Sequence, residues 1–298
     1  ICVWLPIFLA GRCCSYFFFF FKMSASSLVS KRLLLKDARK LLRAVFPVLK
    51  EKDEDVRDIT EKLKLVFNHD LNIRLNAYGI NVSPIGHLET SARGVIGYSV
   101  GMGDGVARWL RLSNRKFVVK GCFGVETCTY NSLGRVVGTA PYDHITEEKL
   151  MQMFPQFLGE IKQAVSPPEA PPHDADKDAK RDHVAIMEHL AVCHSIRCSE
   201  LSLPHFSLEI VCGPGFSPRV FVHDLGKALG SCAHVMHMEL TQYGPFTLEH
   251  ALPSYRWSWE EAKATSEKLH TLWYTHVGDV RNELKDTADR FRNVARYF

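Results

Sequence analysis

Histidine and cysteine side chains gathered in one stretch offer the first candidate chemistry in this sequence. The nitrogen and sulfur atoms of His183, His189, Cys193 and His194 are donors of the kind that zinc binds. Structural zinc sites usually pair their ligands at tighter spacing, and none of the nine cysteines belongs to a Cys-x-x-Cys pair. The stretch is therefore predicted to form a helix over 183–194, and no metal site is expected.

A glycine-rich run over residues 101–105 is a second candidate, because such loops can hold phosphate groups. Its sequence, Gly-Met-Gly-Asp-Gly, does not fit Gly-x-Gly-x-x-Gly, and no Lys-Ser or Lys-Thr pair follows it as a P-loop requires. Glycine also supplies the tight turns between a strand and a helix. The run is predicted to be such a turn rather than a nucleotide site.

Composition and charge limit the class of protein. The chain has 298 residues and a formal net charge of +4, with 46% hydrophobic and 23% charged residues. These values are ordinary for a globular protein and exclude a collagen-like, a fully disordered or a multi-span membrane protein. The scattered cysteines, odd in number, indicate free thiols in a reducing compartment. A cytoplasmic or nuclear location is expected, with mitochondria as the alternative, and no membrane partner is expected.

The beginning of the chain is unusual. Residues 1–22 are apolar and rich in phenylalanine, but they lack the basic start of a signal peptide, and Arg12 interrupts them. A charge at that place is costly inside a membrane. The segment is expected to be translated upstream sequence without a function, and Met23 is expected to be the natural start.

Cations concentrate in residues 27–50, where apolar residues recur at helical spacing. The pattern predicts an amphipathic helix that ends near Pro47, because proline removes a hydrogen-bond donor from a helix. The basic face fits either a solvated helix surface or a contact with RNA phosphates or with an acidic partner. The candidates for RNA contact in this tract are Lys31, Arg32, Arg39, Lys40 and Arg43.

The rest of the chain alternates between helical and strand patterns. Helices are predicted over 53–67, 146–164, 219–230 and within 257–298. Strands are predicted over 95–100, 117–123, 135–137, 206–212 and 234–241, with a turn at 131–134. A proline-rich and polar run over 165–182 is predicted to be a linker or disordered loop.

Two blocks of sequence are specific enough to suggest a family. The first, over 86–96, reads Gly-His-Leu-Glu-Thr-Ser-Ala-Arg-Gly-Val-Ile. The second begins with Cys-Gly-Pro-Gly-Phe-Ser-Pro-Arg over 212–219 and closes with Gly-Pro-Phe-Thr-Leu-Glu over 244–249. These blocks, with Arg-Lys-Phe at 115–117 between them, resemble the TruB family of tRNA pseudouridine synthases, and most closely its animal members.

The resemblance implies an α/β (α+β) fold with a mixed, largely antiparallel sheet of the pseudouridine synthase type and flanking helices. It implies an isomerisation of a uridine in the tRNA T-loop, with the base flipped out of its stack and without a cofactor or metal. Carried over by position, the catalytic carboxylate falls at Glu89, its ion-pair partner at Arg219 and the base-stacking residue at Phe117. His87 and Lys116, in the matching motifs, are expected to contact RNA.

The chain also departs from the family pattern. The family has aspartate at the position of Glu89 and tyrosine at that of Phe117, so the carboxylate is one methylene longer and a hydroxyl is missing. A displacement of about 1 Å can slow a reaction roughly a hundredfold. The family's Lys-Pro-x-Gly strand is not visible before Glu89, and a proline-rich run over 166–172 replaces its Ser-Ala-x-Lys loop.

Three hypotheses therefore stay open. The first is an RNA pseudouridine synthase that acts, as a monomer, on tRNA or on tRNA-like stem-loops. The second is a pseudoenzyme that binds or chaperones RNA without isomerising it, and the third is an interaction protein that docks partners on its terminal helices. The expected organisation is a basic helical region over 23–80, a catalytic domain over 81–256 and a helical region over 257–298.

Overall fold

The computed structural model describes residues 44–71, 80–101, 104–167 and 188–294 of the chain. The basic residues Lys31, Arg32, Arg39, Lys40 and Arg43, the segment 1–22 and most of the predicted linker lie outside the described residues. None of the described helices is long and apolar enough to cross a membrane.

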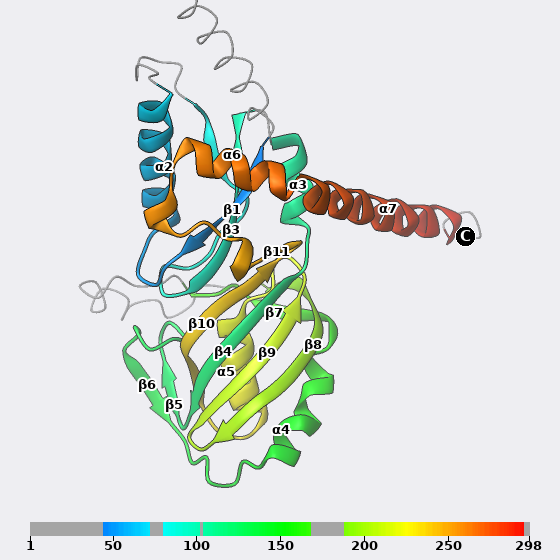
Figure 1. The fold of residues 1–298 in the computed structure, drawn as a ribbon. Coiled ribbons are helices and arrows are strands. Elements are labelled where there is room, and N and C mark those ends of the chain that lie inside the picture. The colour runs from blue at the N-terminus through cyan, green and yellow to red at the C-terminus, as the bar shows by residue number, and fades with distance from the viewer. Residues whose placement is uncertain (1–43, 72–79, 102–103, 168–187, 295–298) are drawn as a thin grey trace, which may run out of the picture. The chain divides into compact units, whose positions relative to one another are not determined.

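A mixed sheet dominates the part of the chain that the structure describes (Figure 1). Its strand order is β1-β3-β10-β4-β9-β8-β7, with β2 beside β3 and β11 beside β10. The bounds are β1 Val45–Lys50, β2 Val82–Pro84, β3 Arg93–Val100, β4 Arg115–Phe123, β7 Gly159–Ala164, β8 Glu188–Ser202, β9 His205–Cys212, β10 Ala233–Tyr243 and β11 Phe246–Thr247. All neighbours are antiparallel except β3 and β10, which confirms the predicted mixed, largely antiparallel sheet.

A hairpin and several helices flank this sheet. The hairpin pairs β5 (Val125–Thr127) with β6 (Val136–Thr139). The helices are α2 Val56–Asp70, α3 Asp104–Arg111, α4 Glu147–Met153, α5 Pro218–Ala228, α6 Trp259–Lys268 and α7 His270–Val294. Short 3₁₀ helices are η2 Phe154–Phe157, η4 Leu248–His250 and η5 Ser254–Arg256. Helix α5 packs on β10, β4 and β7, while α6 packs on β1 and α2.

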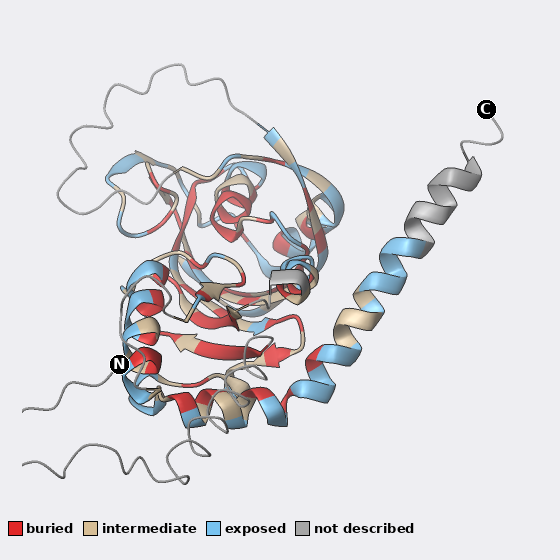
Figure 2. Cartoon of the chain, turned by 90° about the horizontal axis from the view of Figure 1, so that it is seen from above, coloured by how far each residue is buried: buried red, intermediate tan, exposed pale blue. Residues whose placement is uncertain are grey.

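Apolar residues at the predicted spacings form the core (Figure 2). Helix α2 buries Ile59, Leu63 and Phe67 at four-residue steps, as an amphipathic helix must. The Phe67 ring lies 5.9 Å from that of Phe46 on β1, measured between ring centroids. This packing explains why α2 forms where the sequence pattern predicts it, and why it covers the β1 side of the sheet.

The prediction that residues 27–50 form one helix is wrong for its last part. Residues 45–50 form β1, which pairs with β3 from Val45 opposite Ser99 to Lys50 opposite Gly94. Pro47 is tolerated because β1 ends the strand order, where a missing N–H does not interrupt a central ladder. Since β1 belongs to the same sheet as β3, the sheet begins well before residue 81.

Two other predicted helices are corrected in the same way. The helix predicted over 146–164 ends at Met153, and residues 159–164 form β7; Pro155 and Gly159, with its φ of 81°, stop the helix. The helix predicted over 183–194 is a strand from Glu188 onward, because β8 pairs with both β7 and β9. In both places long-range strand pairing overrides a local helical pattern.

Candidate functional site

The side chains of Glu89 and Arg219 meet although 130 positions separate them in the sequence. The Nε of Arg219 lies 2.8 Å from Oε1 and 2.7 Å from Oε2 of Glu89. Only 4% of the Arg219 side chain and 18% of the Glu89 side chain are exposed to solvent. A guanidinium and a carboxylate at this distance and depth form a charge-assisted, weakly screened pair. The expectation that these two residues pair is confirmed.

Helix α5 positions the arginine. Ser217 caps the helix by accepting a hydrogen bond from the Val220 amide, and Pro218 occupies the first helical position, where its missing N–H costs nothing. Gln163 of β7 fixes the cap: its Oε1 accepts from the Ser217 amide at 2.9 Å and its Nε2 donates to the Ser217 carbonyl at 3.1 Å. The start of α5 is therefore tied to the sheet immediately before Arg219.

Backbone carbonyls hold the rest of the guanidinium. Its Nη1 donates to the Thr129 carbonyl at 2.5 Å, and its Nη2 donates to the Pro167 carbonyl at 3.0 Å. Guanidinium donors have a fixed planar geometry, so these two contacts orient Nε toward Glu89. The arginine is thus preorganised by groups that do not belong to the pair.

The loop that carries Glu89 is held by a buried lysine. Lys50, at the end of β1, is 0% exposed, and its ammonium donates to the carbonyls of Ala92 at 2.6 Å, Thr90 at 3.0 Å and Glu51 at 3.0 Å. An ammonium has three donors and is costly to bury without acceptors. These bonds fix the backbone on the C-terminal side of Glu89, just before β3 begins.

The end of β1 also bears on the strand that the family pattern places before Glu89. The family pattern expects a strand with Lys-Pro-x-Gly before Glu89, and β1 is a strand that ends in Lys50-Glu51-Lys52-Asp53. Asp53 has a φ of 65°, in the left-handed region that glycine adopts without cost. The expectation that basic helices stand in place of a strand before Glu89 is therefore wrong for residues 45–50.

Phe117 lies in β4 with 5% of its surface exposed. It stands opposite Leu240 of β10, which in turn stands opposite Gly94 of β3. Two strand spacings separate Phe117 from Gly94, about 10 Å. Gly94 is required there, because a Cβ would lie 2.4 Å from the Leu240 carbonyl oxygen. The sheet thus sets Phe117 two strands away from the end of the Glu89 loop, and no described contact joins its ring to the ion pair.

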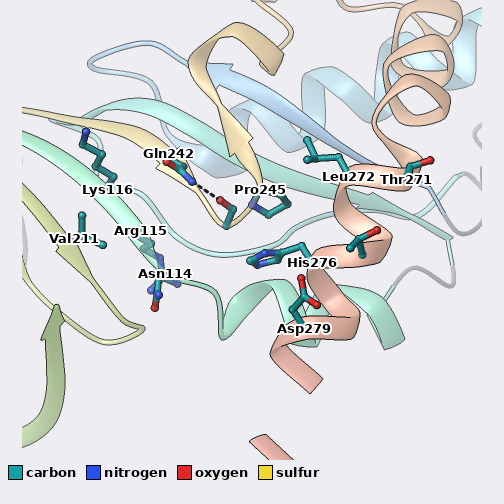
Figure 3. Close-up of a pocket in the computed structure, with 12 residues that line it drawn as sticks. Asn114, Arg115, Lys116, Val211, Gln242, Pro245, Thr271, Leu272, His276 and Asp279 are labelled. Atoms are coloured by element: carbon teal, nitrogen blue, oxygen red, sulfur yellow. Dashed lines mark hydrogen bonds between the residues drawn. The ribbon is translucent and has the colours of Figure 1, made fainter. Parts of the chain in front are cut away.

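The other predicted RNA contacts lie apart from the ion pair. His87 is exposed in the loop before Glu89. Lys116 forms an ion pair with Glu209 at 3.0 Å and lines a cavity of about 740 Å³ (Figure 3). That cavity lies between the ends of β4 and β10 and helix α7, and its lining includes Arg115, Gln242 and His276 but neither Glu89 nor Arg219.

Three of the four candidate metal ligands, His189, Cys193 and His194, lie in β8 with other contacts, and His183 lies outside the described residues. His189 bonds with the Gly215 carbonyl at 2.8 Å, and His194 bonds with Asn114 at 3.0 Å. Cys193 is buried in β8, and that burial raises the pKa of its thiol to about 11. Within the described ranges, no group of three or more histidine, cysteine, aspartate or glutamate side chains is placed to hold a metal ion.

Sequence reasoning missed two parts of this site. Lys50 gave no signal, because its burial depends on carbonyls that only the folded loop provides. Thr129 was missed because it acts through its backbone, which its side-chain type does not reveal. Lys50 is the last residue of a strand that the sequence pattern predicted as helix, and Thr129 lies in the turn region that follows β5.

Comparison with known proteins now adds to this geometry. Residues 80–217 match the TruB family pseudouridylate synthase (N terminal domain). Human pseudouridylate synthase TRUB1 is 34% identical over 198 residues, which are 63% of this chain and 57% of that protein. The tRNA pseudouridine synthase B of Dehalococcoides mccartyi is 29% identical over 171 residues, 56% of this chain and 57% of that protein. The chain thus spans a little over half the length of these relatives.

A solved structure agrees with the fold. The crystal structure of a Cbf5-Nop10-Gar1 complex contains a chain that superposes with a TM-score of 0.53 at 19% identity. The superposition covers 74% of this chain and 54% of the other. The class that this sheet defines is the pseudouridine synthase fold. Within that class, the match over residues 80–217 and the animal relatives make the chain similar to the TruB family, and to its animal members in particular.

Proposed function

We propose that this chain is an RNA pseudouridine synthase that converts a uridine to pseudouridine in the T-loop of tRNA or in a tRNA-like stem-loop. The observation that carries the proposal is the Glu89–Arg219 ion pair, because the family pattern expects a carboxylate and an arginine at these two positions. The family match over 80–217 and the relatives that are named tRNA pseudouridine synthase B support the substrate class.

In the proposed reaction Glu89 supplies the carboxylate that faces the sugar or the base. The C–N glycosidic bond breaks, the uracil turns, and a C–C bond forms from its C5 to the sugar. C5 then loses a proton and N1 gains one, so that the overall change is an isomerisation. Arg219 stabilises the ionised carboxylate and fixes its direction, which matters because reactivity falls steeply with misplacement. The proposed reaction uses no metal or cofactor, as the family implies.

The longer side chain of glutamate is compatible with this role. Both carboxylate oxygens of Glu89 lie within 2.8 Å of the Arg219 Nε, so the extra methylene does not prevent the pairing. Phe117 is proposed to stack on the flipped base, for which its ring face suffices. The missing hydroxyl removes one acceptor for the C5 proton, so the proposal assigns that proton to another group or to water.

The proposed partner is a structured RNA. His87 and Lys116 would contact it from the described part of the chain, and the basic tract over 31–43 would add contacts to phosphates. The catalytic unit is proposed to include β1 together with residues 81–256, since Lys50 holds the Glu89 loop. We further propose that the protein acts as a monomer in the cytoplasm or nucleus.

The test incubates the purified full chain with an unmodified tRNA transcript and maps pseudouridine chemically. The proposal expects modification in the T-loop and its loss in Glu89→Ala. The control Glu267→Ala, which removes an exposed carboxylate on α6, should leave the rate within twofold. Binding of the transcript without any conversion by the wild-type chain would contradict the proposal, because it would make the protein a binder only.

A second variant tests whether glutamate in place of the family's aspartate, and phenylalanine in place of its tyrosine, limit the rate. The double substitution Glu89→Asp with Phe117→Tyr restores the family pattern and should raise the rate about tenfold or more, since it returns a shorter carboxylate and a hydroxyl. A lower rate in the double variant would show instead that the surroundings have adapted to glutamate and phenylalanine.

A further inference from the structure

One face of helix α5 continues beyond the ion pair. Arg219, His223 and Lys227 are spaced by four residues and therefore lie on the same face of the helix. His223 Nε2 lies 2.9 Å from one oxygen of Glu126, and Lys227 Nζ lies 2.5 Å from the other. Because Glu126 belongs to β5, these contacts tie the hairpin that carries Thr129 to the helix that carries Arg219.

An aromatic stack lies in this region. The ring of Tyr130 lies on the imidazole of His223, with centroids 3.9 Å apart and planes 23° apart. Tyr130 directly follows Thr129, whose carbonyl accepts from Arg219, and His223 lies one helical turn after Arg219. The stack therefore adjoins the ion pair through two separate chain segments.

The backbone of Tyr130 is held in an unusual conformation. Its φ is 60°, in the left-handed region that a bulky side chain rarely adopts. Its carbonyl accepts from the Val235 amide at 3.0 Å, and the Tyr130 amide donates to the Thr127 carbonyl at 3.1 Å. Strained residues of this kind persist where their surroundings enforce them, and they cluster at functional sites. The side chain on this backbone is the one that stacks on His223.

Two carboxylates hold the imidazole of His223 in the stack, through contacts of 3.1 Å with Asp224 and 2.9 Å with Glu126. Burial lowers the pKa of the imidazole, but the hydrogen bonds to Asp224 and Glu126 outweigh that effect, so the pKa is raised above its ordinary value. In its protonated form the imidazole is also attracted by the π-system of the phenol. The stack holds one face of the Tyr130 ring, and the residue as a whole is only partly buried.

The phenol of Tyr130 is not suited to accept a proton. Burial and the nearby carboxylates of Asp224 and Glu126 raise its pKa above the ordinary value, so the hydroxyl stays protonated at neutral pH. Tyr98, in β3, offers no alternative hydroxyl to a ligand, because it is fully buried and donates to the Val56 carbonyl at 3.2 Å. What Tyr130 offers to a ligand is therefore the aromatic ring of a partly exposed residue.

We propose that Tyr130, backed by His223, is a stacking platform for an unpaired nucleobase of the RNA next to the base held at Glu89 and Arg219. Bases stack on aromatic side chains with little preference for sequence. The choice of ligand rests on the proposed function, whereas the platform itself rests on the stack, the fixed backbone and the link to Arg219.

The experiment measures equilibrium binding of the full chain to an unmodified T-arm stem-loop transcript at several salt concentrations. Tyr130→Ala should raise the Kd about tenfold, the typical loss of one stacked base. Its slope of log Kd against log salt should stay unchanged, because no phosphate contact is removed. Tyr130→Phe should stay within twofold of the wild type, since it keeps the ring and loses only the hydroxyl.

Controls separate stacking from misfolding. Tyr255→Ala removes an 85% exposed tyrosine on η5 and should leave the Kd unchanged. Each variant is checked by thermal unfolding. A Tyr130→Phe variant that binds as tightly as wild type, while Tyr130→Ala is folded and weak, supports the platform. An unchanged Kd in Tyr130→Ala, or a loss in Tyr130→Phe equal to that in Tyr130→Ala, overturns it.

The outcome is independent of catalysis. If the wild-type chain forms pseudouridine but Tyr130→Ala binds normally, the platform is wrong and the proposed function stands. If the wild-type chain binds the stem-loop through Tyr130 but forms no pseudouridine, the platform stands and the proposed function is wrong.

Discussion

The ion pair and the cavity beside α7 differ in how tightly their polar groups are held. Arg219 and Glu89 are largely buried, and the guanidinium also donates to two carbonyls from distant segments. The cavity has a volume of about 740 Å³, but its Lys116 side chain is 39% exposed and forms an ion pair with the carboxylate of Glu209. Large pockets are the usual first guess for an active site. Here the preorganised charges lie elsewhere, so fixed geometry locates the candidate chemistry better than volume does.

Replacing the arginine of the pair should give the largest effect. Arg219→Lys keeps a positive charge but loses the planar donors that reach Glu89, Thr129 and Pro167 together. The rate of pseudouridine formation should fall by roughly a hundredfold or more. Single-turnover assays on the tRNA transcript measure it, with thermal unfolding to show that the variant is folded. A rate within threefold of wild type would remove the basis for treating this pair as catalytic.

Removing the buried lysine should mainly reduce stability. Lys50→Met keeps the length of the side chain but removes the donor to the buried Ala92 carbonyl, while the Thr90 carbonyl keeps its hydrogen bond from the Asp53 amide at 2.8 Å. A buried acceptor left unpaired costs about 1–3 kcal/mol, so the free energy of unfolding should fall by about 1–3 kcal/mol. Urea unfolding measures this loss. Lys64→Met, on the exposed side of α2, serves as the control and should change stability by less than about 1 kcal/mol.

The His223 contacts should make part of the stability depend on pH. The pKa of His223 is raised in the folded state, so its contribution is fully present below the unfolded pKa and is lost as the pH rises through the folded pKa. Glu126, Asp224, Tyr130 and Lys227 face this imidazole. The difference in unfolding free energy between wild type and His223→Gln, on the order of 1 kcal/mol at pH 6, should shrink by pH 9. A difference that grows with pH would have the wrong sign.

The cavity should give the smallest effect. The pair of Lys116 and Glu209 is exposed to solvent, and such pairs contribute about 0–1 kcal/mol. Lys116→Ala should therefore lower stability by less than about 1 kcal/mol and leave the single-turnover rate within threefold. A hundredfold loss of rate in this variant would show that the reaction depends on the cavity rather than on the Glu89–Arg219 pair.

The sequence predicted the parts of the fold whose signals are local. The strands β3, β4, β9 and β10 and the helices α2 and α5 lie close to their predicted ranges, because their apolar spacing or turn residues are strong. The strands β1, β7 and β8 were predicted as helices, since their strand character comes from neighbours far along the chain. Local pattern does not contain that information.

The candidate site also has a part that local sequence motifs predicted and a part that they did not. The pairing of Glu89 with Arg219 could be expected from the motif that surrounds each residue. The hydrogen bonds from Lys50 and the stack of Tyr130 on His223 could not be expected from sequence. The first depends on backbone carbonyls of the folded loop, and the second on a left-handed backbone conformation at Tyr130. Backbone atoms and backbone angles carry these features, and residue types do not reveal them.

The single parallel junction of the sheet has a mechanical consequence. Strands β3 and β10 are in register only at Arg93 with Glu239 and at Gly94 with Leu240, whereas β10 and β4 stay paired along most of their length. The loop that carries Glu89 leads into β3, on one side of this short parallel junction. Helix α5 packs on β10, on the other side. The ion pair between Glu89 and Arg219 and the one between Arg93 and Glu239 therefore both link segments on the two sides of this short junction, and they add charged contacts where strand pairing is brief.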